Sequence, residues 1–192
     1  MEELINEEII AIIPIYIENK GNSTVIYTNK SKETIYKSIK TVFKNLCNYY
    51  HLDIRQSNNY YKNFVLNKNS IPTPFSGEDI FIQLKVRNPI GKDDGAKGYI
   101  RMDSILDYQQ KEGFSLIRLE NKTELKCLCN IDTIKKQIKN GQIVKTIYRE
   151  KEKKKESDFK KDRNRPVLYG DFKELDKKVE ELIYLIKEGS RS

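Results

Sequence analysis

The sequence is poor in the residue types from which many catalytic and metal sites are built. Among 192 residues there are one histidine, three cysteines and no tryptophan. A single histidine excludes a site that needs several, and the zinc motif HExxH is missing. The phosphate-binding patterns GxGxxG and GxxxxGK[ST] and the hydrolase pattern GxSxG are also missing. The sequence therefore offers no motif for these classes of enzyme.

Long apolar runs are missing as well. A membrane-spanning helix needs about 18 to 20 consecutive apolar residues, and no window of this sequence comes near that length. The opening segment MEELINEE is acidic, unlike the basic start of a secretory signal. We therefore expect a cytoplasmic protein that does not cross a membrane.

The few cysteines predict neither a disulfide framework nor a zinc site. Cys127 and Cys129 stand in an alternating pattern, which points both thiols to one face of a strand rather than into a CxxC knuckle. Cys47 lies four residues before His51, the single histidine. That spacing permits a thiol–imidazole catalytic pair. Because Cys47 also belongs to an apolar helical stripe, we favour an inert, buried thiol.

Basic residues, in contrast, are abundant. The chain has 36 Lys and Arg against 28 Asp and Glu, a formal net charge of +8 at pH 7. Such a surplus favours a polyanionic partner, above all nucleic acid. Charge alone leaves two interpretations open, a DNA-binding surface or a lysine-rich surface that is merely solvated.

The first third of the chain predicts two strands and a helix. Runs of β-branched residues at 9–17 and 23–28 are separated by the turn-forming ENKGN. Pro14 within the first run predicts an edge or a bulge. Apolar residues then recur at helical spacing over 35–50, and Ser31 is the candidate N-cap.

The middle of the chain predicts antiparallel strands. Residues 79–86 alternate between apolar and polar or aromatic side chains, which predicts a strand with one buried face. A second strand is predicted at 98–102, after a loop that contains glycines. Residues 114–129 predict a hairpin that turns near Asn121.

The last third predicts helices. Asp132 is the candidate N-cap of a helix that Gly141 ends, and 171–189 has the apolar stripe of an amphipathic helix. Between them, 145–165 is either a solvated charged helix or a flexible linker. We therefore predict an α+β fold, with an antiparallel, β-rich core, a packed helix in its N-terminal half, and C-terminal helices.

Several basic residues stand where a nucleic acid could be bound. Lys and Arg neutralise phosphates, whereas Arg, Asn and Gln also reach the acceptor edges of A·T pairs in the minor groove. Three lysines share a helical face opposite the apolar stripe, and the following segment DIRQSNNYYKNF mixes basic, amide and tyrosine side chains. The candidate DNA-binding residues are Arg55, Lys62, Lys37, Lys40, Lys44, Arg87, Lys97 and Arg101.

Two other functional classes stay open. Asp79, Asp93 and Asp103 could hold a divalent metal in a nuclease of a mobile element. The chain could instead be a non-catalytic protein-interaction module whose basic segment keeps it dissolved. Metal-independent binding to AT-rich duplex DNA separates a DNA-binding protein from the nuclease, and absence of salt-sensitive DNA binding favours the interaction module.

The order of the segments resembles ComK, the bacterial competence transcription factor family. The resemblance covers most of residues 9–145, although each motif alone is weak. The segments that carry it are "IIAIIP" (9–14), "KTVFKNLCNYY" (40–50), "LDIRQSNNYYKNFVLNKNSIPTP" (52–74), "EDIFIQLKV" (78–86), "KGYIRMDSI" (97–105), the hairpin "LIRLENKTELKC" and the helix "CNIDTIKKQIKNG". Near the end, "RPVLYGDFKE" (165–174) is similar to the family's segment before a final helix.

The resemblance implies a transcriptional activator, not an enzyme, without a catalytic residue, metal or cofactor. It implies that the protein binds AT-rich promoter boxes of double-stranded DNA, chiefly through the minor groove, and oligomerises there beside RNA polymerase. Arg55 is the leading candidate for insertion, because a guanidinium is weakly hydrated and favoured in a narrow groove. It stands just after the predicted helix, in an Asn- and Gln-rich segment where a loop could reach into a groove.

The resemblance also divides the chain into three parts and places it at the nucleoid. Residues 1–145 would be the DNA-binding core, 146–165 the charged helix or linker, and 166–192 an amphipathic helical tail. In that tail, Val167, Leu168 and Tyr169 would dock an adaptor that delivers the protein to a cytoplasmic protease.

Overall fold

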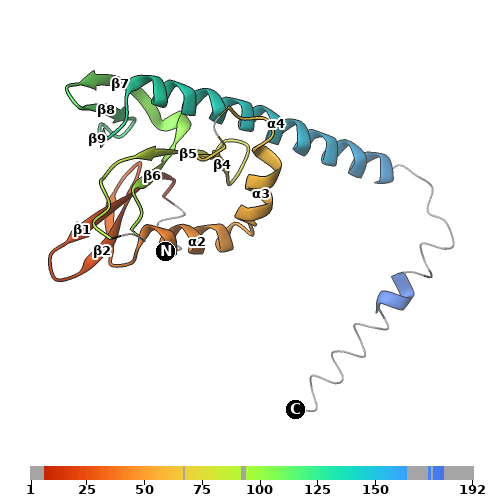
Figure 1. The fold of residues 1–192 in the computed structure, drawn as a ribbon. Helices are drawn as coiled ribbons and strands as arrows, with labels where there is room; N and C mark the ends of the chain where they lie inside the picture. Colours follow the sequence, from red (N-terminus) through yellow and green to blue (C-terminus); the bar gives the residue numbers. More distant parts are fainter. Residues whose placement is uncertain (1–6, 67, 92–93, 164–172, 174, 180–192) are drawn as a thin grey trace, which may run out of the picture. The chain divides into compact units, whose positions relative to one another are not determined.

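The structure, a computed structural model, describes residues 7–66, 68–91, 94–163, 173 and 175–179, with the side chains of 158–163 left aside. The chain divides into two compact units, residues 1–150 and 151–192. The strands are β1 (Ile9–Ile17), β2 (Gly21–Thr28), β3 (Lys32–Ile35), β4 (Thr73–Pro74), β5 (Ile80–Lys85), β6 (Lys97–Arg101), β7 (Ile105–Lys111), β8 (Phe114–Leu119) and β9 (Glu124–Cys127). The helices are α2 (Ile39–Tyr49), α3 (Ile54–Tyr61), the short 3-10 helix η1 (Met102–Ser104) and α4 (Ile131–Arg163) (Figure 1).

The strands form two antiparallel sheets. The six-stranded sheet has the order β3-β2-β1-β6-β5-β4, and β7, β8 and β9 form a three-stranded sheet. With the helices around them, they confirm the predicted α+β class with antiparallel strands. No helix in the described part of the chain is long and apolar enough to cross a membrane.

The first strand explains how Pro14 is tolerated in a central position. β1 pairs with β2 along most of its length, but the structure pairs it with β6 only at Ala11 and Ile12. Pro14 lies beyond that short ladder and faces Thr24 of β2. Proline lacks an N–H, so it fits where the second neighbour no longer pairs. The strand is locally an edge there, although it lies inside the sheet.

The six-stranded sheet is covered on both faces. On one face α2 packs its apolar stripe against side chains of β1, β2 and β5, and the ring of Phe43 stacks on Tyr99 with centroids 3.7 Å apart. On the other face lie the three-stranded sheet and the beginning of α4. The prediction of one buried face for residues 79–86 is therefore wrong, because Phe81 is buried beneath α2 while Ile82 and Leu84 point to the opposite core.

The first helix begins later than the sequence predicts. Residues 32–35 form the edge strand β3, which pairs with β2, so Ser31 caps no helix. Ser38 is the N-cap of α2, and its Oγ accepts a hydrogen bond from Thr41 N at 3.3 Å. In β3 these residues form hydrogen bonds with β2, and this pairing stabilises the strand more than the weak local preference for a helix would stabilise a helical turn. Lys37 consequently precedes the helix instead of sharing its face.

A second short helix, α3, follows where we expected a loop. Its N-cap is Asp53, whose Oδ1 accepts hydrogen bonds from Arg55 N at 2.9 Å and from Gln56 N at 3.0 Å. Only Tyr61 of this helix is fully buried. A helix with so narrow an apolar face gives almost no periodic signal.

The helix α4 is continuous through Gly141, which we expected to end it. Asn130 rather than Asp132 caps it, and its Oδ1 accepts from Thr133 N at 3.0 Å. Gly141 is buried, and a Cβ there would lie 2.7 Å from Met102 Sδ. The glycine therefore permits close packing of the helix.

The same helix includes most of the charged segment 145–165. Of the two alternatives for 145–165, the structure shows a helix as far as Arg163, with exposed side chains at 149–157. Of the predicted helix 171–189, residues 173 and 175–179 are described, and they are helical.

Candidate nucleic-acid interface

Exposed basic side chains gather on α2 and on the start of α3. Lys40 and Lys44 are one helical turn apart on α2, and Arg55 lies in the first turn of α3. Lys37 lies just before α2, where its carbonyl accepts a hydrogen bond from Thr24 Oγ1 at 2.8 Å. Within the described residues, the charged groups of these four side chains form no ion pair or hydrogen bond. They are therefore available to an external anion.

The helix α3 adds polar side chains on the same stretch of chain. Arg55, Asn59 and Lys62 recur at the spacing that places them on one helical stripe. Lys62 is the C-cap residue, and its Nζ donates to Asn59 Oδ1 at 3.1 Å. Residues 50–53 alone connect α2 to α3, a spacing typical of helix-turn-helix units. Sequence reasoning predicted the first of these helices but missed α3, for which the Asp53 N-cap was the one signal in the sequence.

An open groove of about 880 Å³ lies between α2 and the start of α3. Its floor includes the buried Phe43 and the partly buried Leu52 and Tyr99. Lys40 and Lys44 line it together with polar side chains from the connection between the helices. The groove thus combines an apolar floor with cations that have no partner among the described residues.

Cys47 and His51 both line this groove, yet they differ in setting. Cys47 is 3% exposed, and burial raises its pKa to about 11, so the thiol stays protonated at neutral pH. The predicted burial of Cys47 is confirmed. His51 is exposed and lies beyond the end of α2 in a left-handed conformation with φ of 50°. The regular helical spacing on which we weighed a thiol–imidazole pair is therefore not realised.

Arg87, one of the candidate DNA contacts, is used inside the protein. Its guanidinium stacks 4.0 Å from the centroid of Tyr16, and its Nε donates to Gly95 O at 2.7 Å. Its Nη2 donates to Asn22 Oδ1 at 2.6 Å. Asn22 and Tyr16 also donate hydrogen bonds to Asp94, so Arg87 helps to hold the loop after β5 against the β1–β2 hairpin.

Lys97, another candidate, is also committed to the protein. Its Nζ donates to Asn69 O at 2.9 Å and to Ser70 Oγ at 2.6 Å. Burial lowers its pKa from the ordinary lysine value. Lys97 therefore joins β6 to the segment before β4, and two of the three N–H donors of its ammonium group are used within the protein.

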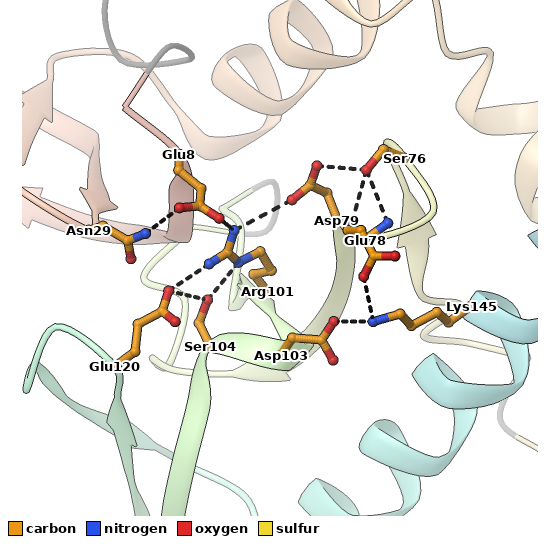
Figure 2. A network of polar contacts seen from close by, with 10 residues as sticks. All are labelled: Glu8, Asn29, Ser76, Glu78, Asp79, Arg101, Asp103, Ser104, Glu120 and Lys145. Atoms are coloured by element: carbon orange, nitrogen blue, oxygen red, sulfur yellow. Dashed lines mark hydrogen bonds and ion pairs between the residues drawn. The ribbon is translucent and has the colours of Figure 1, made fainter. Parts of the chain in front are cut away.

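Arg101 is the most buried of the candidates, at 7% exposure. Figure 2 shows its guanidinium among three carboxylates. It pairs with Glu8, with Glu120 at 2.6 Å and with Asp79 at 3.6 Å, and its Nε donates to Ser104 Oγ at 2.6 Å. Burial lowers the pKa of Arg101, but its hydrogen bonds and charge pairs with Glu8 and Glu120 outweigh that effect and raise it. The structure therefore gives no support to Arg101 as a DNA contact, because its guanidinium is buried and paired with carboxylates of the protein.

The carboxylates considered for a nuclease are likewise engaged. Asp79 accepts a hydrogen bond from Ser76 Oγ at 2.7 Å besides its contact with Arg101. Asp103 pairs with Lys145, which also contacts Glu78 at 3.1 Å (Figure 2). No group of three or more His, Cys, Asp and Glu that could hold a metal exists among the described residues. The geometry therefore gives the nuclease alternative no support.

The remaining candidates lie outside the described residues. They are Asp93 of the nuclease alternative and the adaptor-docking residues Val167, Leu168 and Tyr169. The proposals about them depend on the sequence alone.

Comparison of the chain with protein-family models, with curated proteins and with solved structures finds no match.

Proposed function

We propose that the chain is a DNA-binding transcription regulator that holds AT-rich duplex DNA on the face formed by α2 and α3. The observation that carries this proposal is a division among the basic residues. Arg87, Lys97 and Arg101 make contacts within the protein. Lys40, Lys44 and Arg55, in contrast, are exposed, and their charged groups have no partner in the described part of the chain.

The two helices offer different chemistry to a duplex. Lys40 and Lys44, as mobile point charges on one helical face, suit phosphates. Arg55 and Asn59, together with Gln56, have the donors and acceptors that read base edges. After its Asp53 cap, α3 contains no acidic side chain that would repel DNA. Phosphate contacts would therefore fix the position, and α3 would supply the selectivity.

Recognition through the minor groove follows from the resemblance to ComK. We expected Arg55 to reach the groove from a loop, but it lies in the first turn of α3. It remains the leading residue for base readout, because it is exposed and because helical side chains tilt towards the N-terminus, the end of α3 at which Arg55 lies. Lys62, at the other end of α3, is a secondary candidate for a phosphate.

The broader role also follows from the resemblance. We propose a cytoplasmic, nucleoid-associated activator of competence genes that oligomerises on its promoters and meets RNA polymerase there. Adaptor-fed proteolysis through Val167, Leu168 and Tyr169 belongs to the same proposal. Proteolysis through the tail is separable from DNA binding, whereas activation and oligomerisation on promoters require it.

The test is a titration of labelled AT-rich and GC-rich duplexes at several salt concentrations. If about five to eight phosphates are neutralised, log K falls against log salt with a slope of roughly −4 to −7. Arg55→Ala should reduce the preference for AT-rich DNA, Arg55→Lys should lose part of it, and Lys40→Ala should weaken both duplexes equally. Distamycin, a minor-groove ligand, should compete with the protein.

Two results would contradict the proposal at different points. A slope near zero would show that phosphates are not bound, and the proposal would fail as a whole. If a major-groove ligand competes and distamycin does not, α3 reads the major groove, and only the minor-groove part fails.

A further inference from the structure

We propose that the groove between α2 and the start of α3 binds an amphipathic organic anion, and that the bound anion weakens DNA binding. By such an anion we mean a small molecule with one carboxylate, sulfonate or phosphate group and an apolar body. The second half of the proposal depends on the proposed function, because it places the anion on lysines assigned to DNA. The first half stands without it.

The size and floor of the groove suit an apolar body. Its volume, about 880 Å³, lies within the range of roughly 300 to 1,000 Å³ found for small-molecule sites. Phe43, Leu52, Ile54 and Tyr99 supply apolar surface, and the rings of Phe43 and Tyr99 stack on each other. Burial of an apolar ligand surface there would drive binding.

The lining of the groove selects the charge of the ligand. Lys40 and Lys44 stand one helical turn apart in it, and His51 and Asn48 add hydrogen-bonding groups. Asp53, the one acidic residue among the described residues that line it, already accepts hydrogen bonds from two backbone N–H groups of α3. Two positively charged lysines and one carboxylate give the groove a net positive charge. A negatively charged head group is therefore favoured over a neutral or positive one.

The same lysines link this groove to the DNA-binding face. Lys40 and Lys44 are exposed as well as lining the groove, so their ammonium groups can turn either to a phosphate outside or to an anion inside. An anion bound within removes positive charge from the face and adds negative charge beside it. DNA and the anion therefore oppose each other, and by linkage each weakens the other's binding to the same degree.

Binding is tested with full-length protein and two probes, 1-anilinonaphthalene-8-sulfonate followed by fluorescence and decanoate added as its competitor. Decanoate should displace the fluorescent probe, and decylamine, with the same chain and the opposite charge, should not. The double variant Lys40→Ala/Lys44→Ala should lose about fivefold to tenfold in decanoate affinity. Lys111→Ala/Lys135→Ala, which removes two exposed lysines elsewhere, is the charge-matched control and should bind as the unaltered protein does.

A second variant keeps the test independent of charge. Asn48 is exposed and lines the groove, so Asn48→Trp should place a bulky ring in it without disturbing the core, and it should weaken the binding of both probes. The first half of the proposal is overturned if decanoate fails to bind, if decylamine binds equally well, or if Asn48→Trp and the double variant bind as the unaltered protein does.

The coupling is tested by measuring affinity for a labelled AT-rich duplex in saturating decanoate and in acetate at the same ionic strength. Decanoate should raise the Kd for DNA by about fivefold or more relative to acetate. An unchanged Kd would overturn the second half. If decanoate binds but no duplex is bound even in acetate, the proposed function fails while the anion site stands.

Discussion

Replacement of Arg101 by methionine should destabilise the protein strongly without a direct effect on DNA. Methionine keeps much of the side-chain volume but leaves Glu8, Asp79 and Glu120 without their cation. Removal of one partner from a buried ion pair typically costs about 3–5 kcal/mol of unfolding free energy. The three carboxylates are 56%, 32% and 34% exposed, respectively, so water can partly solvate them after the change. We therefore expect a loss of about 2–3 kcal/mol.

The assay is urea unfolding followed by far-ultraviolet circular dichroism, with DNA affinity measured per folded molecule. Arg118→Met is the matched control: Arg118 is 55% exposed in its side chain and lies 3.7 Å from Asp107, and its loss should cost less than about 0.5 kcal/mol. Glu120→Gln should also cost less than Arg101→Met, because two carboxylates remain for one guanidinium. An Arg101→Met protein of full stability with weakened DNA binding would refute this reasoning and make Arg101 a DNA contact.

Three further predictions concern packing and pH. Gly141→Ala should destabilise by about 1 kcal/mol, because overpacking outweighs the better helix propensity; in a Met102→Ala background, which opens the space, the same change should stabilise, as a double-mutant cycle in urea would show. Hydrogen bonds from Tyr16, from the backbone of Gly91 and from Asn22 lower the pKa of Asp94 from 3.8 to about 2. The stability that Asp94 contributes is thus present above pH 3.8 and disappears as pH falls towards 2. In acid titrations, the unaltered protein should therefore have a higher free energy of unfolding than Asp94→Asn above pH 3.8, and this difference should vanish between pH 3.8 and 2. Cys47→Ala should cost on the order of 1 kcal/mol and leave DNA affinity per folded molecule unchanged, whereas loss of function at full stability would indicate thiol chemistry.

The sheet architecture was accessible from the sequence because its signals are local. The β-branched runs at 9–17 and 23–28 and the hairpin around Asn121 each carry their own turn and strand pattern, and the structure has strands at all three places. The apolar stripe that includes Cys47 likewise predicted a buried helical face. These elements depend little on what the rest of the chain does.

The errors arose where distant contacts decide the local structure. Gly141 was predicted to end a helix, but it lies within α4. A glycine is needed there because a side chain at this position would collide with Met102. With Ser31 as the candidate N-cap, residues 32–35 were predicted as the first turn of a helix, but they instead form an edge strand beside β2. In both cases a tertiary contact overrides a weak local preference.

The candidate site shows the same division. Exposed lysines on α2 were predictable, because a stripe opposite an apolar face must be solvent-facing. The internal roles of Arg87, Lys97 and Arg101 were not, since their partners, such as Glu8 and Glu120 for Arg101, are far away in the sequence. Composition identifies a basic protein, and only the fold shows which charges are already paired.

The measurement that tests the central claim most directly compares two charge-matched variants for binding to a labelled AT-rich duplex. Both Lys40→Ala/Lys44→Ala and Lys111→Ala/Lys135→Ala remove two exposed positive charges. If the face of α2 and α3 binds DNA, the first pair should lower the magnitude of the salt slope by about 2, and the second should leave it nearly unchanged. Equal losses for both pairs would mean that the protein attracts DNA only through its net charge, and would contradict the account.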